Sequence, residues 1–184
     1  MADAAGRPIR RAGEGRLEDG GRVVWTMSEG RRGRRWREVV VDRDGALRHS
    51  LLLETDPAGR FSHLELGTAV GLLTLHPEGD RTLHGNRVGA DGVGHIAGLP
   101  WSVDDVLVVD DSPIAAAAAV HGLAGGRLAP GGAIVDDGLE LRRTDEPIVP
   151  TEPGRWRVGR LTIGLDADGC PLLAGGSGWP LELA

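Results

Sequence analysis

The sequence predicts a mainly β fold, at the border of α+β, in which a curved or half-open antiparallel sheet or barrel carries one short helix near residues 113–121. Glycine and proline are frequent, with 30 and 11 of 184 residues, which is typical of many short strands joined by turns. Short runs of Val and Leu recur between these turns. Helix signals gather in a single segment, DSPIAAAAAVHG at 111–122.

The first segment of the chain differs from the rest. Residues 1–21 lack apolar periodicity and are rich in Gly, Ala and Arg, so we expect a flexible N-terminal tail. Residues 22–184 are expected to form a single β-rich domain, which is long enough to bury one core. The run VVWTMSEG is expected to begin the ordered part as a strand.

Turn residues separate the expected strands. The tetrapeptide DRDG at 42–45 lies between two apolar runs, and its Asp-Gly supplies the positive φ of a tight hairpin turn. Two further strands are expected within 61–76, with Leu64 and Leu66 on one face. Glycines interrupt 82–101, which indicates short strands or loops, whereas the run from Val106 to Val109 indicates a buried strand.

The expected helix has recognisable ends. Ser112 is a good N-cap, Pro113 suits the first turn, and Gly122 can close the helix after five consecutive alanines. A helix of about nine residues does not persist alone in water. It must therefore pack on the sheet, and alanine lets its backbone approach closely. The remaining chain is expected to return to strands and turns, with DDG at 136–138 and DADG at 166–169 as turns.

Composition limits the class of function. The net charge of −6 argues against nucleic-acid binding, and the lone Cys170 excludes an intrachain disulfide. The chain has no secretory apolar region and no apolar run long enough to span a bilayer, so we expect a soluble cytoplasmic protein without stable membrane insertion. All basic charge is carried by Arg, a bias typical of a GC-rich genome.

Motifs for metals and cofactors are incomplete. DRDG and DADG resemble the start of a calcium loop, but the twelfth positions are Leu53 and Ser177, so a turn is the better interpretation. His76, His84 and His95 could converge on a metal, yet a closely spaced pair of ligands is missing and surface histidines are favoured. A P-loop is excluded because the chain has no Lys. We expect no metal and no cofactor.

Two charged segments leave alternatives open. The aspartates of DDVLVVDD could supply a carboxylate pair for acid–base chemistry, although the last two are also explained by their place before the helix. The segment RRGRRWR at 31–37 could bind an anionic ligand, or its charge could protect a strand edge.

Three segments together resemble the bacterial glycolipid-binding family. They are the hairpins from Trp36 through Leu75, the run VDDVLVVDDSPIA, and LTIGLDADGCPL followed by GWPLEL. In the second run, the positions that match the family pattern are Asp110, Ser112, Pro113 and Ile114. The chain departs from that pattern by having no Tyr and by carrying IAAAAAVHG where the family has a polar, basic segment. The resemblance implies a curved antiparallel sheet related in shape to lipid carriers, and binding of an amphiphile.

We therefore expect non-enzymatic binding of an amphiphilic small molecule, such as a glycolipid, in a concave cavity of the sheet. Apolar strands would hold its chains, Trp side chains would stack on a sugar, and the alanine helix would plug one mouth. No catalytic residue is assigned. The residues expected to bind the ligand are Trp36, His84, Trp101, Asp110 and Trp156.

Two other functions remain open at this point. One is a small hydrolase or isomerase that uses a His–carboxylate pair drawn from Asp104, Asp110, His84 and His95. The other is a protein-interaction module that presents the Arg-rich edge. The sequence does not set the oligomeric state.

Overall fold

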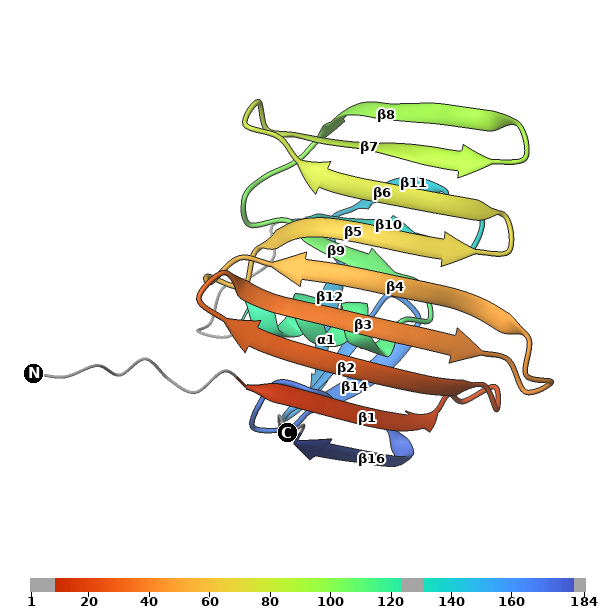
Figure 1. The fold of residues 1–184 in the computed structure, drawn as a ribbon. Coiled ribbons are helices and arrows are strands. Elements are labelled where there is room, and N and C mark those ends of the chain that lie inside the picture. The colour runs from red at the N-terminus through yellow and green to blue at the C-terminus, as the bar shows by residue number, and fades with distance from the viewer. Residues whose placement is uncertain (1–8, 124–130, 181–184) are drawn as a thin grey trace, which may run out of the picture.

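The structure, a computed structural model, describes residues 9–123 and 131–180. It confirms the mainly β class, with one described helix and sheets that do not close into a barrel. A nine-stranded sheet forms one layer. The helix α1 (Pro113–Gly122) and two smaller sheets lie against one face of this layer, which we call the inner face (Figure 1).

The large sheet is an antiparallel meander, and the last described strand pairs with the outer edge of the first. Its order is β16-β1-β2-β3-β4-β5-β6-β7-β8, and all neighbours are antiparallel. Short turns at DRDG and similar sites set this order, because a tight turn returns the chain beside the strand it has just left. The strands are β1 Arg10–Arg16, β2 Arg22–Gly30, β3 Gly33–Val41, β4 Leu47–Thr55, β5 Phe61–Thr68, β6 Gly71–Pro77, β7 Thr82–Gly89, β8 Gly92–Pro100 and β16 Ala174–Pro180.

The sheet begins earlier in the chain than the sequence predicts. Strand β1 lies inside the segment that we expected to be a flexible tail, and it pairs with β2 on one side and β16 on the other. Its sequence, RRAGEGR, lacks the apolar alternation of the other strands because its buried positions are Ala12, Gly13 and Gly15. The tail prediction for residues 10–16 is thus wrong, and residues 1–8 lie outside the described chain.

Side chains alternate between the inner and outer faces of the large sheet. In β2, Val23, Trp25 and Met27 are buried, whereas the residues between them are exposed. A period of two is the expected result of pleating in a sheet covered on one face only.

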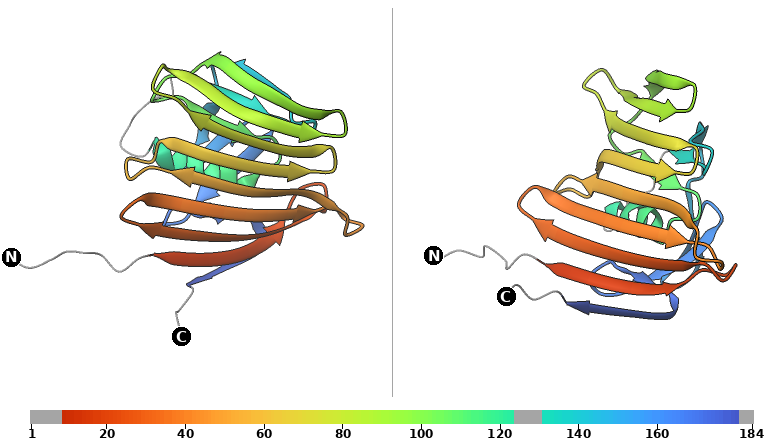
Figure 2. Two further views of the ribbon diagram at one scale, coloured as in Figure 1. Left: turned by 45° about the horizontal axis from the view of Figure 1, so that its top comes forward. Right: turned by 45° about the vertical axis from the view of Figure 1, so that its right-hand side comes forward.

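The second layer contains a parallel pair of strands, which the sequence did not reveal. Strands β9 and β10 run parallel, and α1 connects them, which makes a β-α-β crossover. The turned views in Figure 2 place the two smaller sheets behind the large one. Their strands are β9 Val106–Val109, β10 Gly132–Val135 and β11 Leu141–Thr144 in one sheet, and β12 Ile148–Glu152, β13 Arg155–Val158, β14 Leu161–Leu165 and β15 Pro171–Leu172 in the other.

The alanine helix forms where it was predicted but not at a mouth of the sheet. The Ser112 Oγ accepts a hydrogen bond from the Ala115 backbone N–H at 2.9 Å, which caps the helix. Every residue from Pro113 to Val120 is buried. The helix contacts β3 on one side and β9 and β14 on the other. A helix that is apolar all round suits this position between two layers, and alanine keeps those layers close.

Buried apolar residues form two groups, one on each side of the helix. The larger group joins the inner face of the large sheet to α1 through residues such as Trp36, Leu64 and Ile114. The smaller group joins the helix to the second layer through Val108 and Ala117. The helix is thus the shared element of the interior.

Aspartates hold the hairpin turns. The Asp42 Oδ1 accepts hydrogen bonds from the backbone N–H groups of Asp44 and Ala46, both at 2.9 Å. The Asp166 Oδ1 likewise accepts from Asp168 at 3.0 Å and Cys170 at 2.8 Å. These bonds confirm that DRDG and DADG are turns, since the carboxylates serve their own backbone. No helix in the described part of the chain is long and apolar enough to cross a membrane.

Candidate functional site

The structure separates the five residues expected to line one cavity. Trp36 and Trp101 are buried in the larger core group, where Trp101 stands edge-on to Phe61 with ring centroids 5.6 Å apart. Trp156 packs, partly buried, against the smaller group. His84 lies on the outer face, because its neighbours Leu83 and Gly85 are the buried positions of β7. The inner face is covered by α1 and the second layer rather than open.

Of the five, Asp110 lines a polar hollow beside the N-terminal end of α1. The hollow has a volume of about 350 Å³, which includes the part that is open to solvent. It lies at the C-terminal ends of the parallel strands β9 and β10. The Asp110 side chain is 6 % exposed, and its Oδ2 lies 3.7 Å from both Arg142 Nη2 and Arg160 Nε. Neither carboxylate oxygen has a hydrogen-bond partner among the described residues. Burial raises the pKa of Asp110, although Arg160 and Arg142 act to lower it.

We predict that Asp110→Asn stabilises the protein at neutral pH by about 1 kcal/mol, because the ionised carboxylate is buried without a hydrogen bond. The raised pKa means that the folded state holds this proton at higher pH than the unfolded state. The wild type therefore loses stability as pH rises through that window, and the advantage of the variant disappears below the ordinary Asp pKa. Urea unfolding of both proteins at pH 3.5 and 7 measures this, and a less stable variant at pH 7 would contradict it.

A buried polar pair crosses from the large sheet to the helix. The Glu38 Oε1 lies 2.8 Å from His49 Nε2, and the Glu38 Oε2 accepts a hydrogen bond from the Ile114 backbone N–H at 3.1 Å. The two side chains are 0 % and 3 % exposed. A carboxylate at the N-terminus of a helix is favoured by the helix dipole and by free N–H groups. This pair therefore positions the helix.

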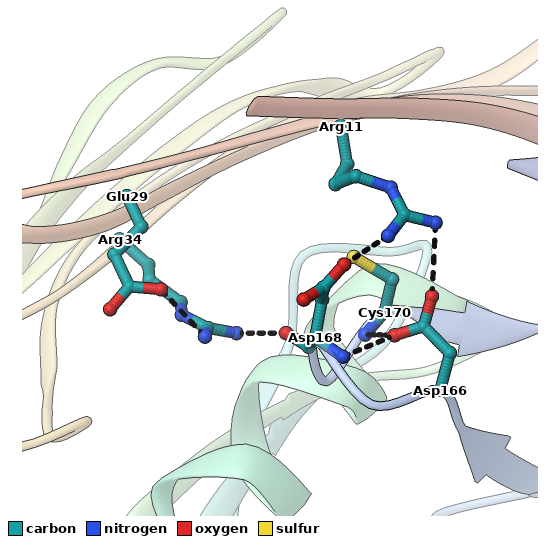
Figure 3. Close-up of polar contacts among 6 residues, drawn as sticks. All are labelled: Arg11, Glu29, Arg34, Asp166, Asp168 and Cys170. Carbon is teal, nitrogen blue, oxygen red and sulfur yellow. Dashed lines mark hydrogen bonds and ion pairs between the residues drawn. The ribbon is translucent and has the colours of Figure 1, made fainter. Parts of the chain in front are cut away.

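A second polar cluster joins the large sheet to the DADG turn (Figure 3). Arg11 reaches from β1 to the carboxylates of Asp166 and Asp168. Arg34 lies between Glu29, with Nη2 to Oε2 at 2.7 Å, and the backbone carbonyl of Asp168, to which Nη1 donates at 2.7 Å. The alternation of β3 thus turns Arg34 inward while Arg35 and Arg37 are exposed, so the RRGRRWR segment is divided between two faces.

Cys170 lies inside this cluster and is unsuited to nucleophilic chemistry. It is fully buried, and burial raises the pKa of its thiol to about 12. A thiol that stays protonated at neutral pH is a poor nucleophile.

The remaining titratable groups that sequence analysis singled out are held by local contacts. His76 is the cross-strand neighbour of His84, and the His84 and His95 ring centroids are 6.1 Å apart. Their rings contact Glu78, Thr82 and Asn86. The described residues contain no group of three side chains that could hold a metal.

Asp105 is likewise used in the structure of the loop before β9. Its Oδ2 receives Arg143 Nη1 at 2.6 Å and accepts a hydrogen bond from the Ser102 backbone N–H at 2.8 Å. Neither Asp105 nor Asp110 is hydrogen-bonded to a histidine within the described ranges. Of the two aspartates in the enzyme hypothesis, Asp104 and Asp110, the second therefore has no histidine partner among the described residues.

An apolar hollow opens at the other end of the helix. It holds about 450 Å³ counted out to solvent, between the β4–β5 hairpin, the start of β9 and the C-terminal end of α1. Gly59 and Gly122 bring hairpin and helix together, because a Cβ on Gly59 would lie 2.9 Å from the Gly122 Cα. The residues that line the hollow include Leu53, Thr55, Arg60, Phe61, Val103, Val106, Leu107, Ala118, Ala119 and Leu123.

Two polar atoms at this hollow are buried and unpaired. They are the Thr55 Oγ1 and the Arg60 Nε, for which the described residues offer no hydrogen-bond partner. Both residues flank the β4–β5 turn, and Arg60 makes no ion pair within 4 Å in the described part of the chain. Buried polar groups are nearly always paired in folded proteins. The mostly apolar wall of this hollow thus includes two residues, Thr55 and Arg60, that each carry an unpaired buried donor.

Sequence reasoning missed Thr55 and Arg60. The segment ETDPAGRF shows only a turn between two strands, and the hollow arises because this turn meets the end of a helix about 60 positions later. Glu38 could have been recognised from the sequence as a buried carboxylate, because it occupies an inward position in the alternation of β3 between buried Trp36 and Val40.

Comparisons with known proteins returned no match: no protein family, curated protein or solved structure resembles the chain significantly. The site is therefore interpreted from its own geometry.

Proposed function

We propose that the protein is a non-enzymatic binding protein for a small amphiphile, which inserts a slender apolar group into the hollow at the C-terminal end of α1. The observation that supports this most directly is the pair of unpaired buried polar atoms, on Thr55 and Arg60, beside a mostly apolar hollow. Ligand sites in proteins typically combine apolar walls with a few placed polar groups.

The walls select the apolar part of the ligand. Leu53, Phe61 and Leu107 are buried, and Ala118 and Ala119 present only methyl groups. Most of the 450 Å³ is open to solvent and the cavity itself measures only about 30 Å³, so the hollow takes the end of one short alkyl chain at most. Burial of each methylene contributes about 0.8 kcal/mol.

Arg60 and Thr55 select the polar head. A guanidinium and a hydroxyl donate hydrogen bonds, so the head carries acceptor oxygens, as carboxylates, phosphates and sugars do. A glycolipid with a short chain satisfies these requirements and agrees with the family that the sequence resembles. A fatty acid satisfies the same chemical requirements.

The test is calorimetric titration with octyl glucoside and with octanoate, each below its micellar concentration. We expect saturable binding of at least one, about 10- to 150-fold weaker in Arg60→Ala, since a hydrogen bond to a charged group contributes roughly 1.5–3 kcal/mol. Val103→Trp should abolish binding, because Val103 lies exposed on the rim and a larger side chain there closes the mouth.

Val70→Trp is the matched control. Val70 is also an exposed valine, but it lies in the turn between β5 and β6, so this variant should bind as the wild type does. The proposal would be overturned if the wild type bound neither octyl glucoside nor octanoate. It would also be overturned if Val103→Trp bound as tightly as the wild type.

A further inference from the structure

An apolar row crosses the outer face of the large sheet. Strand register places Val24, Val39, Ser50, Gly67, Leu72, Val88 and Val93 side by side on seven successive strands, β2 to β8. We call these seven residues the outer belt. Its five large members are 42–72 % exposed, and they are half of the ten exposed large hydrophobic residues in the described chain. Contiguous exposed apolar residues of this kind mark interaction surfaces.

The belt has a dip next to a projection. Ser50 and Gly67 are small, and they form the floor of a surface hollow of about 560 Å³, counted out to solvent, between Val39 and Leu72. Val39, which is 46 % exposed, stands beside this floor on the neighbouring strand β3. The surface thus offers both a recess and a side chain of a size that could fill one.

A charged row runs beside the belt. Arg37, Leu52 and Glu65 are cross-strand neighbours on β3, β4 and β5, one position further along each pleated face. Arg37 has no ion pair in the described ranges, and Glu65 contacts only His63, at 3.2 Å. The two charges are two strands apart, about 9–10 Å, so they do not neutralise each other within one molecule.

We propose that the part of the outer belt on β2 to β6 is the contact surface between two copies of this chain, related by a two-fold axis that lies along β4 between the two outer faces. Such an axis exchanges β3 with β5 and β2 with β6. It places Arg37 opposite Glu65 of the second copy, and Val39 over Gly67 of the second copy. It also places Val24 against Leu72 of the second copy. The face is therefore complementary to itself in both charge and shape, as an isologous interface requires.

The contact is small for a stable dimer. From β2 to β6 the sheet is about 19 Å wide, so the covered area is on the order of several hundred Å² per copy. That is below the roughly 800 Å² per partner of a standard stable interface. We therefore expect a weak dimer that is in equilibrium with the monomer.

The test is sedimentation velocity of the full chain between about 1 and 200 µM, a range that detects a weak dimer. We expect the wild type to shift from monomer to dimer, and Arg37→Glu and Glu65→Arg to weaken dimerisation at least tenfold each, because every dimer of either variant would contain two like-charged pairs. An equimolar mixture of these two variants should dimerise again, since in each mixed dimer the two glutamates of one copy would face the two arginines of the other. Arg155→Glu, an exposed reversal on β13 in the other layer, is the control.

Both substituted positions are exposed, and circular dichroism verifies that the variants are folded. A wild type that stays monomeric at the highest concentration would overturn the proposal, whatever else the belt binds. A dimer that neither reversal weakens would place the interface elsewhere. Failure of the mixture to dimerise would also contradict the proposed axis.

Discussion

Replacing Glu38 by alanine is expected to destabilise the folded protein by about 3–5 kcal/mol. The Glu38 carboxylate is fully buried and bonds at once to His49 and to the Ile114 backbone N–H. Its removal leaves an imidazole and a helix N–H unpaired in the interior, and it opens a cavity between β3 and α1. Each of these changes costs free energy, and removal of one partner from a buried pair is worse than removal of both.

Urea unfolding followed by circular dichroism measures this effect at neutral pH. Glu152→Ala is the matched control, since Glu152 lies exposed on β12, and it should change stability by no more than about 0.5 kcal/mol. Glu38→Gln should lie between these two variants because it keeps an acceptor for the Ile114 N–H. A loss below about 1 kcal/mol in Glu38→Ala would mean that the pair does not anchor the helix.

The second large effect is expected from Ala117→Leu, which should cost about 2–3 kcal/mol. Ala117 is 0 % exposed and faces the smaller core group, next to Val108. The helix has core on both sides, so a larger side chain cannot move outward without separating the two layers.

Ala119→Leu is the informative comparison. Ala119 lines the apolar hollow, so a leucine there has space to occupy, and we expect a smaller loss of stability. Thermal or urea unfolding of both variants decides the matter. Equal stability of Ala117→Leu and the wild type would contradict the tight spacing between the layers.

The sequence predicts local features of this fold well because they depend on neighbouring residues. The helix at 113–121, the DRDG turn and the buried strand from Val106 to Val109 all follow from caps, turn chemistry and apolar runs, and the structure confirms them. Strand β1 escapes prediction because its pairing partners, not its own alanine and glycines, make it a strand.

The placement of the helix and the site could not be predicted in this way. Whether α1 lies at a mouth or between layers depends on where β9, β10 and the later strands pack, and those contacts join distant parts of the chain. The tryptophans expected to stack on a ligand, Trp36 and Trp101, are instead core residues. Arg60 carries no local signal, since only the meeting of a hairpin with a helix end gives it a role.

The pairing of the first described strand with the last has a consequence for how the chain can be connected. Arg11 in β1 lies opposite Pro180 in β16, so the two ends of the described chain are neighbours in one sheet (Figure 1). During synthesis, β1 has one vacant edge until the final strand leaves the ribosome. A short linker could join these ends, with a new break made at the Asp91-Gly92 turn. Such a circular permutant would keep every other strand contact while making β1 and β16 consecutive, which would turn the longest-range pairing of the molecule into a local one.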